Sequence, residues 1–372
     1  MSAMPDPAEV VPPAAFRLSA VVLVTLLCAA LAWGLVGVGR ALPTVRALPA
    51  AFWLDGRASR VLEKMQELPA NSTLHSLNAG VQYRLFGELG PQVSEGCPGW
   101  LFYGDGLRLA AGVDPDFVFA QRLRLMRYYT ARLRQLGVPL LVVTVPDKSR
   151  IETGGLCGLR QAPVLAAQLA RWQTALQQQG VPYVALQSAL EAARPAYFRT
   201  DVHWNQHGAL AAAQAVAQVA RPMLGGAGPQ QYLREVGPAV LPRMGDLIVL
   251  AGLEHAPRAL RPALDLEQPE TIRAVHGGTL LDEPAPPEIL LAGSSNSRRS
   301  NFEQQLGALL GREMWNRSLD GGNFSDALRA ALDDHAAWPH GLKLVVWEMS
   351  EMSLSLPLSP AEQAYLAHDT MP

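Results

Sequence analysis

The stretch EILLAGSSNS, residues 288–297, places a short apolar run directly before a glycine and four polar residues. Two further runs, PLLVVTV at 139–145 and LKLVVWE at 342–348, are likewise rich in Leu and Val. Strands that are apolar on both faces and alternate with helices are typical of a parallel sheet that helices cover on both sides. The sequence therefore predicts an α/β fold.

Amphipathic patterns between these runs predict the covering helices. Two more strands are expected at VPYVAL (181–186) and at Glu313–Arg317. The expected helices span 117–136, 162–179, 207–224, 302–310 and 325–332. Residues 225–287 carry many Pro and Gly residues, so we expect insertions or a small β element there.

An uncharged apolar run covers residues 18–39, between Arg17 and Arg40. As a helix it is long enough to cross a hydrocarbon core of about 30 Å. Its length favours a single-pass transmembrane anchor over a cleaved signal peptide, whose apolar core is usually shorter. Residues 1–17 would then form a cytoplasmic tail.

The anchor sets the expected order of the remaining regions. Residues 40–95, with a short helix at 58–68, are predicted to be a stalk or linker. Residues 96–353 would form the α/β domain, with 225–287 inserted, and residues 354–372 a C-terminal tail.

The charges and the cysteines predict opposite sides of the membrane for the body of the protein. Arginines follow the anchor at positions 40, 46, 57 and 60, and the positive-inside rule would keep the body in the cytoplasm. Cys97 and Cys157 are the only cysteines after the anchor, and we predict a disulfide between them, which would form in an oxidising compartment. The residues alone leave the side open.

The composition excludes several classes of function. With 49% hydrophobic residues and a net charge of -2, the chain is globular and has no basic excess for nucleic acid. It has no GxxxxGK[ST] or GxGxxG motif for a nucleotide cofactor. His203 and His207 have metal-ligand spacing, but Trp204 stands where a metalloprotease helix has Glu, so we expect no metal.

Two polar motifs are expected at the carboxyl ends of strands, where parallel sheets bind ligands. The first is GSSNS (293–297), and the second is TDVHW (200–204). A serine becomes a good nucleophile when a histidine takes its proton, and a carboxylate fixes that histidine. Asp201 and His203 lie two residues apart, so a bent loop would allow them to bond. Each motif alone is commonly an ordinary turn or helix cap.

Together the motifs resemble a known family. TDVHW, an Ala-rich helix and LLAGSSNS about ninety residues later resemble the alginate O-acetyltransferase proteins of the AlgJ/AlgX type, whose domain is SGNH-hydrolase-like. GWLFYGDGL (99–107) and VTVPDKSRI (143–151) are similar to early segments of the same family. The resemblance implies an SGNH-hydrolase-like parallel sheet with a circularly permuted motif order, because Asp201 and His203 precede Ser295.

The resemblance also implies the roles of the residues. Ser295 would be the nucleophile, His203 the general base and then acid, and Asp201 the orienting carboxylate. In NRSLDGG (316–322), Gly321 would donate to the oxyanion together with the backbone N–H of Ser295, with Gly322 as the alternative. The family's third block has an Asn where this chain has WEMSE (347–351), so Asn296, Asn323 or a water would have to replace that donor.

Five further residues are candidates for substrate binding. Each has an ordinary alternative: a solvated turn for the lysine, a solvated helix face for the arginines and core packing for the tryptophan. These candidates are Lys148, Trp204, Arg298, Arg299 and Tyr197.

The resemblance implies a periplasmic O-acetyltransferase, anchored in a bacterial inner membrane, that acts on an exopolysaccharide such as alginate or cellulose. It would bind no cofactor and would receive acetyl from a donor or a partner protein. The implied partners are a multispanning membrane O-acyltransferase and other exopolysaccharide synthesis and secretion subunits. A carbohydrate acetylesterase with the same triad and an inactive scaffold subunit remain the alternatives.

Overall fold

The structure is a computed structural model that describes residues 13–46, 71–276 and 286–368. The chain divides between His75 and Ser76 into two compact units, and each is described by itself. The helix expected at 58–68 lies outside the described residues.

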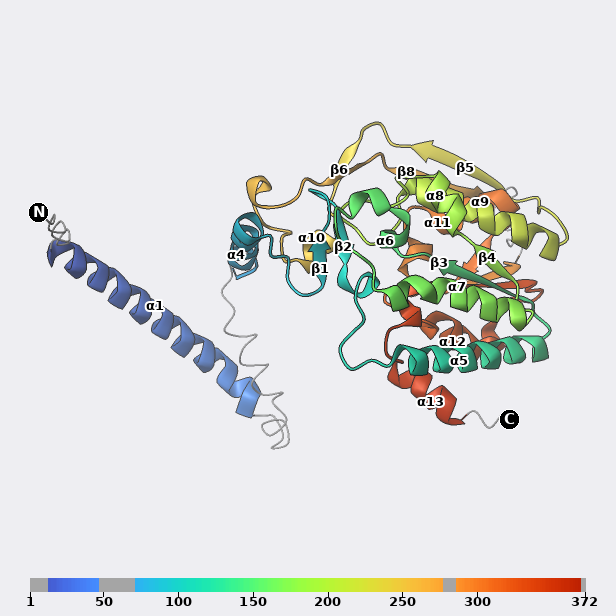
Figure 1. Ribbon diagram of the computed structural model, residues 1–372, viewed down its shortest axis with the longest axis horizontal. Helices are drawn as coiled ribbons and strands as arrows, with labels where there is room; N and C mark the ends of the chain where they lie inside the picture. Colours follow the sequence, from blue (N-terminus) through green and yellow to red (C-terminus); the bar gives the residue numbers. More distant parts are fainter. Residues whose placement is uncertain (1–12, 47–70, 277–285, 369–372) are drawn as a thin grey trace, which may run out of the picture. The chain divides into compact units, whose positions relative to one another are not determined.

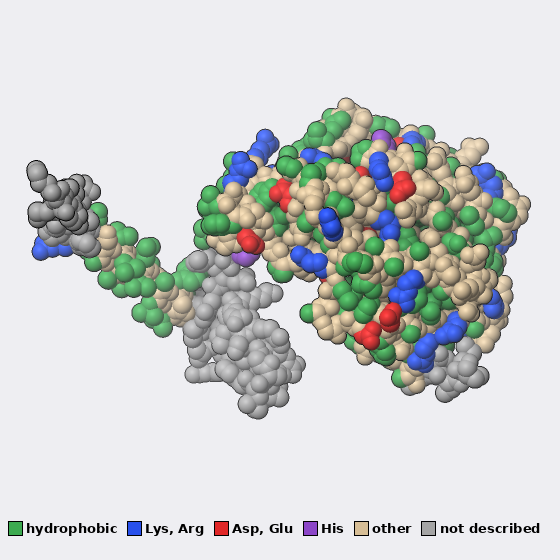
Figure 2. Space-filling view, in the orientation of Figure 1, with side chains coloured by type: hydrophobic (Ala, Val, Ile, Leu, Met, Phe, Trp, Pro, Cys, Tyr) green, Lys and Arg blue, Asp and Glu red, His purple; other side chains and the backbone are tan. Residues whose placement is uncertain are grey.

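The N-terminal unit contains the long helix α1 (Pro13–Arg46). Residues Arg17–Val36 of α1 have a mean hydropathy of 2.4, and none of this stretch is buried. Figure 2 shows the described part of this helix as mainly apolar. By length and composition α1 is a candidate membrane span, and a signal sequence would have the same properties.

The second unit is built on a five-stranded parallel sheet with the order β10-β9-β11-β3-β4. The last strand of the chain, β11, lies at the centre and pairs with both β9 and β3. This arrangement confirms the predicted α/β fold. The strands are β3 (Leu140–Val145), β4 (Tyr183–Ala185), β9 (Ile289–Ala292), β10 (Met314–Asn316) and β11 (Leu344–Ser350).

Helices cover both faces of the sheet, and each layer has its own core (Figure 1). Successive residues of a strand point to opposite faces, so Leu141 and Val143 enter one core while Val142 enters the other. The first core contains α8 (Gln187–Ala192), α9 (Gln206–Met223) and α11 (Phe302–Leu310). The second contains α5 (Pro115–Gln135), α7 (Pro163–Gln178) and α12 (Asp326–Asp333).

The region predicted as an insertion contains two antiparallel strand pairs, β5–β8 and β6–β7, within its described part. Their bounds are β5 (Gln231–Val236), β6 (Leu241–Arg243), β7 (Asp265–Glu267) and β8 (Glu270–Val275), with helix α10 (Asp246–Leu250) between β6 and β7. The remaining short elements are α6 (Lys148–Ile151) and 3-10 turns at Gly104–Gly106, Thr153–Gly155, Arg258–Leu260, Ser295–Arg298, His335–Ala337 and Glu351–Leu354.

Part of the predicted stalk belongs to the folded unit. Strands β1 (Val93–Glu95) and β2 (Leu101–Tyr103) pair, and Leu89 and Val93 are buried in a third core with α10. Helix α4 (Asn71–Phe86) contacts the body through small residues, since a Cβ on Gly80 would lie 2.9 Å from that of Leu260. Such a contact leaves no apolar periodicity in the sequence, so the sequence does not reveal that these residues pack on the folded unit.

A disulfide joins Cys97, after β1, to Cys157, after α6, with Cα atoms 4.8 Å apart. The predicted pairing is confirmed. The bond ties the segment that precedes β2 to the loop that follows β3 and α6. It closes a sequence separation of 60 residues, and a constraint of this length typically stabilises a fold by about 2–4 kcal/mol.

The predicted C-terminal tail contains helix α13 (Pro360–His368), which packs on α5. Arg122 of α5 and Glu362 of α13 form an ion pair of 2.7 Å between side chains that are 1% and 0% exposed. Glu362 also accepts hydrogen bonds from the hydroxyl of Ser325 and the backbone N–H of Ser359. A single buried pair leaves no charge pattern, so the sequence did not reveal this helix as part of the fold.

Replacing Glu362 with Ala leaves the Arg122 guanidinium buried without its anionic partner. We expect the free energy of unfolding to fall by about 3–5 kcal/mol, measured by urea denaturation. Glu235→Ala, which removes the partner of Arg273 from an exposed pair, is the matched control and should cost less than about 1 kcal/mol. Equal losses in the two variants would contradict the structural role of the buried pair.

Candidate active site

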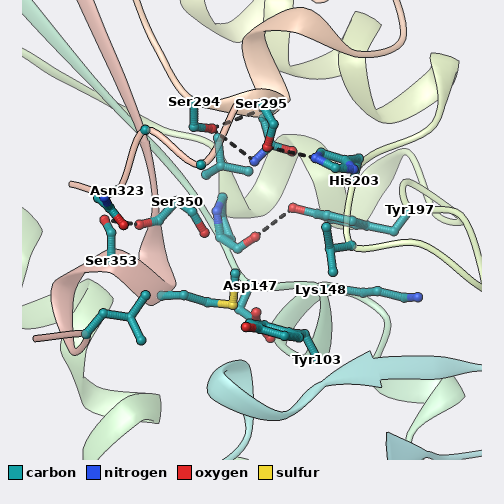
Figure 3. Close-up of a pocket in the computed structure, with 18 of the residues that line it drawn as sticks. Tyr103, Asp147, Lys148, Tyr197, His203, Ser294, Ser295, Asn323, Ser350 and Ser353 are labelled. Carbon is teal, nitrogen blue, oxygen red and sulfur yellow. Dashed lines mark hydrogen bonds between the residues drawn. The ribbon is translucent and has the colours of Figure 1, made fainter. Parts of the chain in front are cut away.

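The two sequence motifs meet at one cavity at the carboxyl end of the sheet. The cavity has a volume of about 170 Å³, and Figure 3 shows Ser295 and His203 turned toward each other at its edge. Segments that follow β3, β9, β10 and β11 all contribute to its lining. The lining includes Phe102, Tyr103, Pro146, Asp147, Tyr197, His203, Ser294, Ser295, Asn296, Gly321, Asn323 and Ser350.

The serine turn, residues 293–297, begins directly where β9 ends at Ala292. A Cβ on Gly293 would lie 2.2 Å from the Ser297 Oγ and 2.7 Å from a Glu348 carboxylate oxygen, so only glycine fits. The Ser294 hydroxyl accepts a hydrogen bond from the N–H of Asn296 and thereby caps the following 3-10 turn. This tight reversal leaves the half-buried Ser295 at the rim of the cavity.

Glu348 of β11 lies beside this turn and is 2% exposed. Its carboxylate accepts three hydrogen bonds, from the N–H of Ser294 at 2.6 Å, the Ser294 hydroxyl at 2.9 Å and the Ser297 hydroxyl at 2.8 Å. Burial raises the pKa of Glu348, while these hydrogen bonds act in the opposite direction. In the sequence, Glu348 stands out only as part of the WEMSE segment that lacks the family's Asn, whereas in the structure its carboxylate holds the serine turn.

A continuous chain of hydrogen bonds joins the three residues of the predicted triad. The Nδ1 of His203 lies 2.7 Å from Asp201 Oδ1, and its Nε2 lies 2.8 Å from the Ser295 hydroxyl. Asp201 Oδ1 also accepts the backbone N–H of His203, which closes the short loop between them. Because a carboxylate can only accept, Nδ1 is the donor, and in the neutral imidazole Nε2 is left to accept the serine proton.

Two residues that sequence reasoning missed complete the surroundings of this pair. Arg243 of β6 donates to Asp201 Oδ2 at 2.5 Å. Asp246, at the start of α10, donates its backbone N–H to the same oxygen and places its own carboxylate 3.3 Å from His203 Nδ1. His203 therefore faces two carboxylates. Both residues come from the Pro- and Gly-rich region, which carries no motif that signals them.

These contacts shift the pKa values of the pair in opposite directions. Burial alone would lower the pKa of His203, but the hydrogen bonds and charges of Asp201 and Asp246 outweigh it and raise this pKa to about 9. Burial alone would raise the pKa of Asp201, but the hydrogen bond and charge of His203 and the charge of Arg243 lower it well below its ordinary value. The geometry thus favours a charged pair in the resting site.

The loop that follows β10 contacts the serine turn and contains Gly321, the residue expected to donate to the oxyanion. Gly293 donates its N–H to the Ser318 hydroxyl and accepts the N–H of Leu319. Gly321 follows with a φ of +68° and lines the cavity, whereas the N–H of the alternative, Gly322, is bonded to Leu319 O. This geometry brings Gly321 to the cavity that Ser295 borders.

The two asparagines considered as replacement donors both line the cavity. The amide nitrogen of Asn323 lies 2.7 Å from Asp326 Oδ2. Asn296 is buried, and its side-chain nitrogen lies 3.5 Å from the Ser294 Oγ.

Lys148 lines the cavity, as expected for a residue that reaches the cleft, but it is not a solvated turn residue. It is 4% exposed, and its ammonium donates to the backbone oxygens of Leu101, Arg199 and Asp201. In Figure 3 its side chain runs away from Ser295. Burial lowers the pKa of Lys148 to about 7. Lys148 instead joins β2 to the loop that carries Asp201.

The other substrate-binding candidates are also placed. Trp204 is fully buried, packs against Phe302 and donates to Asn296 O, so it is a core residue and does not stack on a sugar. Tyr197 lines the cavity but is 2% exposed and donates to Pro146 O. Arg298 and Arg299 lie outside the cavity lining and approach Asp320 on the surface.

Asp201, His203 and Asp246 form the one group within the described residues whose ligand atoms are close enough to suit a metal. Hydrogen bonds already engage both oxygens of Asp201 and both ring nitrogens of His203. His207, considered with His203 as a ligand pair, is exposed and lies outside this cavity. The donor set therefore fits a proton-transfer chain better than a metal centre.

The chain is similar to proteins of known name. The chain is 29% identical over 316 residues to a protein named probable alginate O-acetylase AlgJ of Pseudomonas putida, covering 82% of this chain and 81% of that protein. The protein of the same name from Pseudomonas aeruginosa is 27% identical over 327 residues, with 82% and 81% covered.

Solved structures show the same fold. The O-acetyltransferase domain of Pseudomonas putida AlgJ matches with a TM-score of 0.65 and 27% identity over 75% of this chain and 98% of that domain. Pseudomonas aeruginosa AlgX matches with a TM-score of 0.53 and 22% identity over 74% and 67% of the two chains. The model of the family described as SGNH hydrolase-like domain, acetyltransferase AlgX, matches residues 93–351, which contain both motifs and the whole cavity-forming sheet. The chain therefore belongs to the AlgX family of SGNH hydrolase-like acetyltransferases.

Proposed function

We propose that this protein is a periplasmic polysaccharide O-acetyltransferase that carries acetyl on Ser295. The observation that supports the proposal is the Asp201–His203–Ser295 hydrogen-bond chain at a cavity of an acetyltransferase fold. The names of the relatives, alginate O-acetylases, support a polysaccharide as the acceptor.

The contacts define the proposed first half-reaction. His203 Nε2 takes the Ser295 proton as Oγ forms a bond to the acetyl carbonyl carbon. The backbone N–H groups of Ser295 and Gly321 stabilise the resulting oxyanion. The bond from carbon to the donor oxygen then breaks, and His203 returns its proton to that leaving oxygen. Asp201 holds the imidazole and stabilises its charged form throughout.

The second half-reaction reverses these roles with a polysaccharide hydroxyl. His203 takes the hydroxyl proton, the sugar oxygen bonds to the acetyl carbon, and the bond to Ser295 Oγ breaks. Ser295 recovers its proton from His203. Water in place of the sugar would give the esterase reaction, so the acceptor distinguishes the two activities.

We also propose the setting of this reaction. Helix α1 anchors the protein in the inner membrane with the body in the periplasm, and a multispanning acyltransferase supplies acetyl, so the chain itself binds no cofactor. The Cys97–Cys157 disulfide supports an oxidising compartment, against the arginine count after the anchor.

Replacing Ser295 with Ala should abolish acetyl transfer. We expect kcat/KM on a chromogenic acetyl ester to fall at least about 10³-fold, because no other group in the chain takes the acetyl. Mass spectrometry of the wild type should find acetyl on the Ser295 peptide. Ser188→Ala, at an exposed serine of α8, is the matched control. Undiminished turnover in Ser295→Ala would refute the acyl-serine mechanism and would favour the scaffold alternative.

Because the Asp246 carboxylate lies beside His203 as a second negative charge, we predict that kcat/KM is highest at alkaline pH. Only neutral His203 can accept the serine proton, so kcat/KM should rise with pH and reach half its maximum near pH 9. Asp246→Asn removes one of the two charges that raise this pKa, and its profile should move to lower pH. Glu235→Gln, at an exposed glutamate of β5, should leave the profile in place. An unchanged profile in Asp246→Asn would show that Asp246 does not act on His203.

Glu348→Gln tests the support of the serine turn. The amide keeps the size of the side chain but replaces one acceptor oxygen with a donor that opposes the N–H and hydroxyl groups of the turn. Ester turnover should fall about a hundredfold, because small displacements of a nucleophile are costly. The melting temperature, followed in parallel, separates this effect from unfolding. Wild-type kcat/KM in a folded variant would mean that the turn holds its shape without the carboxylate.

A further inference from the structure

A second cavity of about 670 Å³ lies beside the loop that carries His203, and we term it the lateral groove. Its volume is in the range of sites that bind organic ligands of drug size. We propose that the lateral groove binds a strand of uncharged glycan, the acceptor of acetyl; this rests on the proposed function. The groove is lined by a residue directly before β2 and by residues from α9, α11 and strands β5, β7 and β8, including Trp100, Tyr197, Phe198, Gln206, His207, Arg234, Val236, Leu266 and Gln305.

The groove adjoins the proposed catalytic cavity through shared aromatic residues. Tyr197 lines both cavities. Trp100 lines the groove and stacks on Phe102, which lines the catalytic cavity, with ring centroids 6.5 Å apart. The groove and the catalytic cavity therefore share a wall.

The charges of the groove are paired with one another. Arg199 lies 3.3 Å from Asp265, and Arg234 lies 3.1 Å from Glu270. The remaining carboxylate, Glu267, lies 3.3 Å from Arg243, which already holds Asp201. Among the described lining residues the carboxylates thus outnumber the guanidinium groups, and each guanidinium is engaged. A polyuronate, with a carboxylate on every sugar, finds no cationic excess here.

Two orphaned carbonyl oxygens favour a ligand that is rich in hydroxyl groups. Gln305 is 2% exposed and donates to Ser300 O, but its Oε1 has no partner within the described part of the chain. Gln206 Oε1, at the start of α9, is also buried without a partner there. Sugar hydroxyls can donate to such oxygens, directly or through one water.

Aromatic side chains are a third feature of the groove that is typical of a sugar-binding site. Trp100 and Phe198 line the same groove, and aromatic faces provide an apolar surface beside polar groups that fix orientation. The groove therefore combines aromatic rings, hydrogen-bonding amides and paired charges without a cationic excess.

The test compares two oligosaccharides on the full chain in detergent. Isothermal titration with a β-1,4-glucan hexamer and a mannuronate hexamer, at physiological ionic strength, should show tighter binding of the glucan by about tenfold or more. Val236→Trp, at an exposed position that lines the groove, should weaken glucan binding about tenfold, and Gln305→Leu should weaken it as well. Val240→Trp, at an exposed position outside the lining, is the matched control and should bind like the wild type.

Turnover of a small acetyl ester is measured on the same proteins and should be unchanged in the two surface variants Val236→Trp and Val240→Trp, because the ester is too small to reach the groove and the catalytic cavity together. Equal or tighter binding of mannuronate, or equal glucan binding by Val236→Trp and Val240→Trp, would overturn the inference while ester turnover persists. If the wild type does not turn over the ester, that result instead counts against the proposed acetyl transfer. Glucan binding is then judged by the titrations alone.

Discussion

The hydrogen bonds between the buried carboxylate of Glu348 and the serine turn are the interaction on which the rest of the site depends. They join the central strand β11 to the end of its neighbour β9. Gly293 is required because Glu348 and Ser297 fill the space that a side chain would need. With the turn held in this way, the Ser295 hydroxyl lies within hydrogen-bond distance of His203, which comes from a separate part of the chain.

Two parts of the structure provide the residues of the site, the parallel sheet and the β5–β8 region. The parallel sheet provides the serine turn and the adjoining Gly321 loop. The β5–β8 region provides Arg243 and Asp246, which contact the Asp201–His203 pair, and much of the lining of the lateral groove. The electrostatic setting of His203 and the wall of the groove thus come from one region, outside the sheet.

Sequence reasoning succeeded where a repeated pattern carries the information. The apolar runs at 139–145, 288–292 and 342–348 correspond to β3, β9 and β11, and helix α11 has the predicted bounds, because burial on both faces demands continuous apolar residues. The positions of Asp201, His203 and Ser295 in one motif order led to a triad hypothesis that the geometry accommodates. What the sequence did not reveal depends on single contacts: Glu348 under the turn, Asp246 beside His203 and the Arg122–Glu362 pair that fixes α13. No periodicity or motif marks a lone buried charge whose partner lies far along the chain.

The place of β11 has a consequence for how the protein is made. It is the last strand to leave the ribosome, yet it lies between β9 and β3, so the two halves of the sheet have no strand in common until it arrives. It also brings Glu348 to the serine turn. A nascent chain that already contains Asp201, His203 and Ser295 therefore lacks both a joined sheet and a supported serine.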